Sequence, residues 1–225
     1  MACWKEGKKL KFRRSQLLIY AVTDRAWSED TGLVSQVEEA LKGGATMIQL
    51  REKELDGKQM ELFYREAMEI RQLTQRYKVP LIIDDNLELA LKCQADGLHV
   101  GQNDMDAALA RRLLGPERIL GVTAKTVEQA KKAQADGADY LGSGAVFGTL
   151  TKSDAKPMSR EMLQAICASV SIPVVAIGGI CLDNISRLAG TGAVGAAIVS
   201  GIFAAKDIEG TTRQLKARME EALQA

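Results

Sequence analysis

The sequence predicts a single α/β domain folded as a (β/α)8 TIM barrel, a closed parallel sheet ringed by helices. A repeated unit is the first observation: an amphipathic helix, a joint rich in glycine or aspartate, a short apolar strand and then polar residues. Ala95-Asp96-Gly97 before Leu98–Val100 is one copy, and Gly43-Gly44-Ala45 before Met47–Leu50 is another. Because crossover helices make successive strands parallel, the polar residues after every strand meet at one edge of the sheet. Folds of this kind hold their ligands at that edge.

The number of these units is the second observation. Strands are expected at eight apolar runs, Leu17–Val22, Met47–Leu50, Leu81–Ile83, Leu98–Val100, Ile119–Val122, Tyr140–Leu141, Val174–Ile177 and Ala197–Val199. Helices are expected at Leu33–Lys42, Lys58–Lys78, Leu87–Lys92, Met105–Leu114, Val127–Gln134, Ser159–Val170, Asp183–Ala189 and Thr211–Leu223. Eight units in 225 residues favour a closed barrel. The alternative, an open doubly wound sheet, usually has a glycine-rich loop after its first strand, whereas this chain continues as Thr23-Asp24-Arg25.

Composition limits the class of protein further. With 46% hydrophobic and 26% charged residues, residues 16–225 are expected to form one barrel domain, preceded by a basic, poorly ordered tail over residues 1–15. A net charge of +1 and the lack of a long apolar segment predict neither a nucleic-acid nor a membrane partner. Four scattered cysteines lack metal-ligand spacing, which predicts free thiols in a reducing cytoplasm. A homo-oligomer is compatible with all of these features.

Three carboxylates follow neighbouring predicted strands. Asp84 and Asp85 come directly after Leu81–Ile83, and Asp104 lies just beyond the next strand, so the three side chains are expected side by side. Mg²⁺ takes one or two carboxylates and completes its octahedron with water and phosphate oxygens. The sequence therefore predicts a magnesium site here. The alternative is that each aspartate only starts a turn or caps a helix.

Polar residues also follow the second strand. Gln49, Arg51 and Lys53 alternate along the chain and are expected on the same side of an extended segment. Two cations and an amide in that position can bind a diphosphate or a heteroaromatic ring. The alternative is a solvated charged loop.

The later strands end in hydroxyl groups and glycines. Thr149-Leu150-Thr151-Lys152 offers two hydroxyls and an ammonium group, which predicts contact with an anion or, if Lys152 is buried, a Schiff base. Gly178-Gly179 and Val199-Ser200 follow the seventh and eighth strands, where this fold commonly holds a phosphate. His99, the one histidine, is expected to be a structural residue with satisfied hydrogen bonds and not a base.

Taken in chain order, these segments resemble the thiamine-phosphate synthase family. The resemblance covers nearly the whole predicted barrel and rests on Gln49–Lys53, Ile83–Asp85, Asp96–Asp104, Gly121–Thr126, Thr149–Ala155 and Ala176–Ile180. It implies a (β/α)8 barrel that joins a hydroxymethylpyrimidine diphosphate to a thiazole phosphate. Diphosphate would leave in a Mg-assisted dissociative displacement, giving thiamine phosphate.

The resemblance also implies a role for each matching residue. Asp85 and Asp104 would hold Mg²⁺. The residues implied to contact the pyrimidine substrate or its diphosphate are Gln49, Arg51, Lys53, Asp84, Thr123 and Lys152, of which Thr123 and Lys152 would act in catalysis. The residues implied to hold the thiazole phosphate are Thr149, Thr151, Gly179, Val199 and Ser200. Departures from the common family pattern occur at Asp84, Thr123, Lys125 and Gly148, where asparagine, serine, histidine and proline often stand.

Two rival functions follow from the same pattern. The related thiazole tautomerase shares the barrel but resembles this chain less at Asp85, Asp104 and Lys152. A non-catalytic, phosphate-binding regulatory barrel would bind the ligands without converting them. The presence of all three residues favours the synthase.

Overall fold

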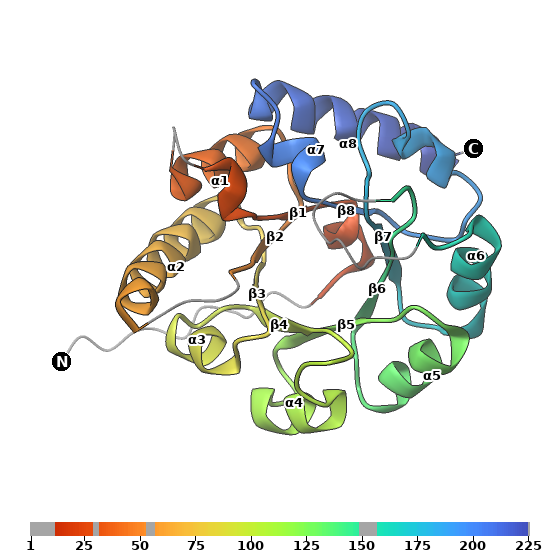
Figure 1. Cartoon of the computed structure of the whole chain (residues 1–225), viewed down its shortest axis with the longest axis horizontal. Helices are drawn as coiled ribbons and strands as arrows, with labels where there is room; N and C mark the ends of the chain where they lie inside the picture. The colour runs from red at the N-terminus through yellow and green to blue at the C-terminus, as the bar shows by residue number, and fades with distance from the viewer. Residues whose placement is uncertain (1–11, 29–31, 53–56, 149–156, 225) are drawn as a thin grey trace.

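Eight parallel strands close into a barrel. The computed structural model describes residues 12–28, 32–52, 57–148 and 157–224. Neighbouring strands pair in chain order, and the first pairs with the last (Figure 1). They are β1 (Ile19–Val22), β2 (Met47–Leu50), β3 (Leu81–Asp84), β4 (Gly97–Val100), β5 (Ile119–Thr123), β6 (Tyr140–Gly144), β7 (Val174–Ile177) and β8 (Ala196–Ile198). The predicted (β/α)8 barrel is confirmed.

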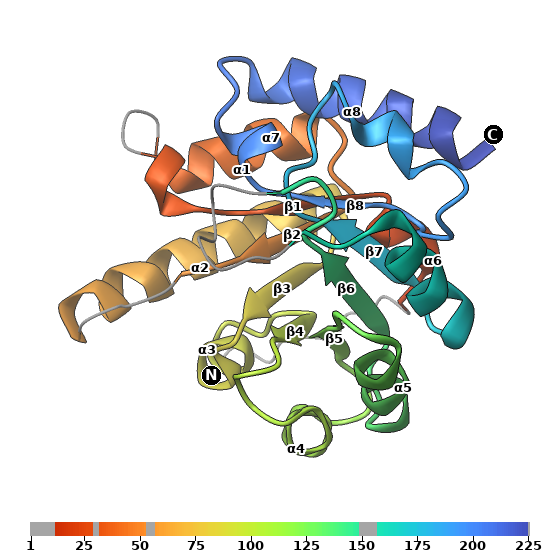
Figure 2. The same cartoon turned by 45° about the vertical axis from the view of Figure 1, so that its right-hand side comes forward.

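Helices surround the strands (Figures 1 and 2). The α-helices are α1 (Leu33–Lys42), α2 (Gly57–Tyr77), α3 (Leu87–Lys92), α4 (Ala107–Leu114), α5 (Val127–Ala135), α6 (Arg160–Ser169), α7 (Ser200–Phe203) and α8 (Ile208–Gln224). The 3-10 helices are η1 (Arg14–Leu17), η2 (Arg25–Trp27) and η3 (Ile185–Leu188). Within the described ranges, every helix is too short or too polar to cross a membrane.

The helix expected over Asp183–Ala189 is wrong, because only the 3-10 turn η3 forms there. Arg160 of α6 donates hydrogen bonds to the carbonyl oxygens of Arg187 and Ala189. Gly190 then follows with a φ of +68°, in the left-handed region where helices commonly end. These contacts with α6, which lies far away in the sequence, stop the segment after one turn.

The start of the barrel also differs from expectation. β1 begins at Ile19 and not at Leu17, because η1 occupies Arg14–Leu17. The domain boundary expected after residue 15 therefore falls inside η1. Just before this turn, the ring of Phe12 lies 6.0 Å from that of Tyr140, and Phe12 packs against the apolar cluster inside the barrel.

Side chains inside the barrel fill the half near the amino ends of the strands. Inward-facing residues of successive strands form a compact cluster that includes Tyr20, Met47, Ile82, Tyr140 and Val175, each at most 1% exposed. Burying each large apolar side chain contributes about 1.5–3 kcal/mol to folding. Because that half is packed, a pocket can form only near the carboxyl ends of the strands, where inward-facing polar residues border it.

Two of the repeated joints carry the same set of contacts at the amino ends of the strands. In each, an aspartate lies just before a strand and accepts a backbone N–H from the start of the neighbouring, earlier strand. The same aspartate pairs with an arginine on the helix that leads into this earlier strand. The sets are Asp96 with Leu81 and Arg71, and Asp139 with Leu120 and Arg111. These contacts give a structural reason for the aspartates in the sequence repeat.

Candidate active site

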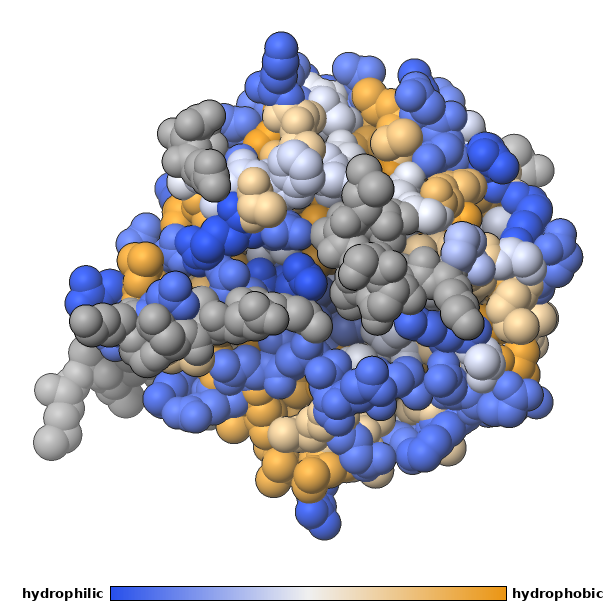
Figure 3. Space-filling model, in the orientation of Figure 1, coloured by the Kyte–Doolittle hydropathy of each residue, from blue (hydrophilic) through white to orange (hydrophobic). Residues whose placement is uncertain are grey.

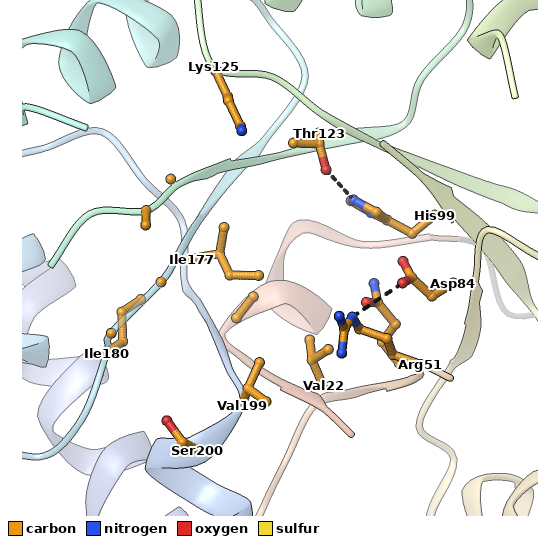
Figure 4. Close-up of a pocket in the computed structure, with 16 residues that line it drawn as sticks. Val22, Arg51, Asp84, His99, Thr123, Lys125, Ile177, Ile180, Val199 and Ser200 are labelled. Carbon is orange, nitrogen blue, oxygen red and sulfur yellow. Dashed lines mark hydrogen bonds and ion pairs between the residues drawn. The ribbon is translucent and has the colours of Figure 1, made fainter. Parts of the chain in front are cut away.

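A pocket opens at the carboxyl ends of the strands. About 880 Å³ of space lies between its walls, part of it open to solvent. Hydrophilic residues gather around the centre of the face shown in Figure 3, and Figure 4 shows the residues that line the pocket. The lining residues are Val22, Gln49, Arg51, Asp84, His99, Thr123, Lys125, Gly144, Ala145, Ile177, Gly178, Gly179, Ile180, Ala197, Val199 and Ser200.

Arg51 forms the charged end of the pocket together with two carboxylates. Its guanidinium lies 3.7 Å from an oxygen of Asp24 and 3.7 Å from an oxygen of Asp84, and the Asp84 contact is visible in Figure 4. The hydroxyl of Thr23, which is fully buried, accepts the backbone N–H of Arg51 at 3.0 Å. The backbone is thereby held in place. Because 3.7 Å is longer than a hydrogen bond, the guanidinium keeps donor capacity for an anionic ligand.

Arg25 neutralises the acidic residue next to Arg51 in the sequence. It donates hydrogen bonds to Glu52 and, at 2.6 Å, to Glu66 of α2. The hydrogen bond with Glu66 is the main reason that the pKa of Arg25 is raised, and Glu52 adds to it. The Glu52 carboxylate is therefore paired away from Arg51.

Hydrogen-bonded side chains inside the barrel form the floor of the pocket. His99 places Nε2 3.0 Å from Oγ1 of Thr123 and Nδ1 3.1 Å from the hydroxyl of Tyr140. The contact with Thr123 is drawn in Figure 4. Gln49 donates from Nε2 to the hydroxyl of Tyr20 at 2.7 Å. Burial raises the pKa of both tyrosines above the usual value, so both hydroxyls are protonated at neutral pH.

Backbone groups and a serine form the opposite end of the pocket. Gly178 and Gly179 have φ values of +104° and +65°, the region that favours glycine, and a Cβ on Gly179 would overlap the carbonyl oxygen of Gly148. Val199 is the N-cap of α7 and Ser200 its first residue, and the first N–H groups of a helix lack acceptors within it. In Figure 4 these two residues lie across the cavity from Arg51. This end can bind an anion through the backbone.

The three carboxylates expected side by side do not form one cluster. Asp84 faces the pocket beside Arg51, whereas Asp85 turns with a φ of +57° and donates its N–H to the carbonyl of the facing strand β4. Asp104 is exposed and accepts the N–H of Gly101 at 2.9 Å. No group of three acidic, histidine or cysteine side chains suited to a metal ion occurs among the described residues. The expected three-carboxylate cluster is therefore wrong.

The predicted binding residues divide into two groups. Those that line the pocket are Gln49, Arg51, Asp84, Thr123, Gly179, Val199 and Ser200. Those that lie outside the described residues are Lys53, Thr149, Thr151 and Lys152.

Sequence reasoning missed two polar residues of the pocket. His99 has both ring nitrogens hydrogen-bonded, as a structural residue would, yet it also borders the cavity. Its register with Asp84 is visible only once β3 and β4 are paired. Lys125 follows Thr123 by two residues, just as Arg51 follows Gln49, and the alternation of side chains along extended backbone indicates the same side.

A family model described as thiamine monophosphate synthase matches residues 19–202, the large majority of the chain. The chain belongs to the thiamine monophosphate synthase family. Thiamine-phosphate synthase 2 of Streptococcus pneumoniae serotype 4 is 44% identical over 210 residues, which are 93% of this chain and 99% of that protein. Thiamine-phosphate synthase of Ruminiclostridium cellulolyticum is 47% identical over 197 residues, which are 88% and 92% of the two chains.

A solved structure agrees with this family membership. Thiamine phosphate pyrophosphorylase from Pyrococcus furiosus superposes with a TM-score of 0.84 and is 40% identical, over 93% of this chain and 98% of that one. 3-Hexulose-6-phosphate synthase, at 17% identity and a TM-score of 0.63, shares the fold alone. The likeness to this family therefore extends over nearly the whole chain and goes beyond a shared fold.

Proposed function

We propose that the protein is a thiamine-phosphate synthase. This transferase joins 4-amino-2-methyl-5-(diphosphooxymethyl)pyrimidine to a thiazole phosphate and releases diphosphate. The main support is a single pocket with two different anion-binding ends, the guanidinium of Arg51 on one side and the backbone around Gly179 and Ser200 on the other. Val22 and Ile177 lie between them and offer apolar surface for two rings (Figure 4).

The charged end suits the pyrimidine diphosphate. Arg51 binds the departing diphosphate, because a guanidinium matches phosphate oxygens and stabilises charge that develops there. Gln49 and Thr123 hold the ring, and Asp84 hydrogen-bonds the exocyclic amine. Lys53 and Lys152 are also assigned to this substrate, and this part of the proposal rests on the family resemblance.

The backbone end suits the thiazole phosphate. In this fold the loops after the seventh and eighth strands and a short extra helix commonly bind phosphate, and α7 is such a helix. Gly179, Val199 and Ser200 would hold the phosphate. Thr149 and Thr151 are assigned to the same group from the family resemblance.

The reaction asks for positioning and charge neutralisation more than for a base. Departure of diphosphate from an electron-rich aminopyrimidine leaves a stabilised carbocation, which the thiazole nitrogen captures. Holding both rings in contact removes most of the entropic barrier to their meeting. Thr123 and Lys152 contribute hydrogen-bond donors, and His99, whose nitrogens both have partners in the fold, is not used as a base.

The donor set also fits Mg²⁺. Asp85 and Asp104 are both held at the end of β4, because Asp85 donates its N–H to the carbonyl of His99 and Asp104 accepts the N–H of Gly101. Two carboxylates are what Mg²⁺ takes from a protein when water and phosphate fill the other positions. We therefore assign Asp85 and Asp104 as its ligands. When bound, the ion neutralises charge on the departing diphosphate.

The proposed partners are the two small-molecule substrates. A net charge of +1 offers no general attraction to nucleic acid or to an anionic membrane. Cys93, Cys167 and Cys181 are free thiols, and burial raises the pKa of Cys167 to about 11. Free thiols fit the proposed cytoplasmic location. A homo-oligomer is compatible with the proposal.

One assay tests the function against both rivals. The protein is incubated with both substrates and Mg²⁺, and the products are followed by phosphorus NMR. We expect one thiamine phosphate and one diphosphate per turnover, and neither product when one substrate is left out. Isomerisation of the thiazole phosphate alone would instead identify a tautomerase. Binding of both ligands without turnover, by folded protein, would identify a regulatory barrel.

A further inference from the structure

A continuous row of hydrogen bonds crosses the inside of the barrel beneath the pocket. It runs from Gln49 to Tyr20 at 2.7 Å, on to Tyr140 at 2.7 Å, to Nδ1 of His99 at 3.1 Å and from Nε2 of His99 to Thr123 at 3.0 Å. The two end residues border the pocket, and the two tyrosines are at most 1% exposed. The roles proposed above do not use either tyrosine.

We propose that this row is a one-way relay that fixes which atoms Gln49 and Thr123 present to the pocket. Tyr20 and Tyr140 are then positioning residues, because they act through the two end residues and do not touch the substrate themselves. The relay is a property of the free protein. Only its effect on substrate binding rests on the proposed function.

Counting protons gives the direction of the relay. Each tyrosine carries one proton, because burial raises its pKa above the usual value. The amide nitrogen of Gln49 donates to Tyr20, so the proton of Tyr20 is left for the hydroxyl of Tyr140. The proton of Tyr140 is then left for Nδ1 of His99.

The relay sets the tautomer of the one histidine. A neutral imidazole that accepts a hydrogen bond at Nδ1 carries its proton on Nε2. His99 therefore donates from Nε2 to Oγ1 of Thr123. The hydroxyl proton of Thr123 is left for a ligand.

The two ends of the relay thus have opposite polarity at the pocket. Gln49 commits its amide nitrogen to Tyr20 and offers its oxygen as an acceptor, whereas Thr123 offers a donor. A heteroaromatic ring with an amino group and a ring nitrogen is complementary, because the amino group donates to Gln49 and the ring nitrogen accepts from Thr123. If the relay ran the other way, both pocket atoms would reverse roles and such a ring would meet mismatched groups.

A glycine in β5 leaves the space that the relay occupies. A Cβ built on Gly121 would overlap the hydroxyl of Tyr140 and would lie 2.5 Å from Nδ1 of His99. Real Cβ contacts are not this short. The hydrogen bond between the tyrosine and the histidine therefore depends on the missing side chain at position 121.

The tautomer of His99 tests the relay directly. Because His99 is the only histidine in the chain, its ring signals need no assignment among several residues. Protein labelled with ¹⁵N-histidine is studied without substrate, at a pH where the ring shifts show it to be neutral. We expect the proton on Nε2 in the wild type. Gln49→Glu replaces the first donor by a carboxylate that only accepts, so the relay should reverse and move the proton to Nδ1. Adding Tyr20→Phe to Gln49→Glu should abolish this switch.

Two results would overturn the relay. One is a proton on Nδ1 in the wild type, and the other is an unchanged tautomer in a folded Gln49→Glu variant. Because no substrate is present, either result would leave the proposed function standing. Absence of product in the synthase assay would likewise leave the relay standing.

Kinetics test whether the tyrosines position the pocket. Tyr140→Phe should raise the KM for the pyrimidine diphosphate roughly fivefold, the scale of one hydrogen bond, and leave the KM for the thiazole phosphate unchanged. Tyr77→Phe, which removes a hydroxyl on α2, is the matched control and should change neither. Equal increases in both constants with Tyr140→Phe would contradict a positioning role.

Discussion

The amino and carboxyl ends of the barrel strands use polar residues in different ways. At the amino ends, Asp96 and Asp139 each accept a strand N–H and pair with a helical arginine. At the carboxyl ends, Gln49, Asp84 and Thr123 each have a different partner. The repeated contacts join helix to strand in a standard way, whereas the unrepeated ones form one pocket. Stability should therefore depend on the first set and turnover on the second, as is usual for this fold.

The largest effect is expected from the proposed metal ligands at the carboxyl end. Asp85→Asn and Asp104→Asn should each lower Mg²⁺-dependent kcat/KM roughly 100-fold, the scale of losing one electrostatic stabiliser of the transition state. Asparagine tolerates the left-handed φ of +57° at position 85, so Tm should stay the same. The measurement is kcat/KM against Mg²⁺ concentration, with Tm as the control. Full activity in both variants would remove the metal assignment.

A smaller loss is expected at Arg51. Arg51→Ala removes the guanidinium that faces Asp84 and should raise the KM for the pyrimidine diphosphate roughly 10- to 100-fold, the scale of a charge-assisted hydrogen bond. Arg51→Lys keeps the charge and should recover part of the loss. Steady-state kinetics with each substrate varied in turn make the measurement. An unchanged KM in Arg51→Ala would show that the diphosphate binds elsewhere.

At the amino end, the expected effect is on stability. Asp139→Ala leaves the buried N–H of Leu120 without its acceptor and should cost about 2 kcal/mol. For a chain of this size, that loss lowers Tm by roughly 4–8 °C. Thermal unfolding measures the change, and kcat of the folded variant should match the wild type. A loss of kcat without a loss of stability would reverse the division between the two ends.

The smallest effect is expected from a nearby aspartate that accepts no strand N–H. Asp136 lies in the same joint as Asp139, but its carboxylate pairs with Lys132, an exposed side chain one helical turn away. A pair with such an exposed lysine contributes little. Asp136→Ala should therefore shift Tm by about 1 °C or less. A shift as large as that of Asp139→Ala would mean that any charge in the joint matters, and not the hydrogen bond to the strand.

Much of the fold could be predicted because it is encoded locally. Each strand has its own apolar run, and α1 and α3 have the predicted bounds because their apolar and polar residues alternate with helical spacing. The segment Asp183–Ala189 could not be predicted, since its length is set by hydrogen bonds from Arg160 in a different helix. A contact of that kind leaves no periodic pattern.

The candidate site was predictable in part for the same reason. Polar residues directly after apolar runs, such as Arg51 and Thr123, do line the pocket. The supposed cluster of three carboxylates failed because Asp84 pairs with Arg51 in the pocket, whereas Asp104 accepts the N–H of Gly101, and the residue pattern specifies neither contact. His99 was missed as a pocket residue because its importance comes from partners in β5 and β6, distant in sequence.

The central claim is that the two substrates occupy opposite ends of one pocket, and the two Michaelis constants of Gly179→Ala test it most directly. The added Cβ would meet the carbonyl oxygen of Gly148 in a left-handed turn, which should disturb the backbone that binds the thiazole phosphate. We predict a KM for the thiazole phosphate that rises roughly tenfold or more, as expected for loss of a charge-assisted hydrogen bond, and an unchanged KM for the pyrimidine diphosphate. A variant with wild-type Tm that raises only the KM for the pyrimidine diphosphate would contradict the claim.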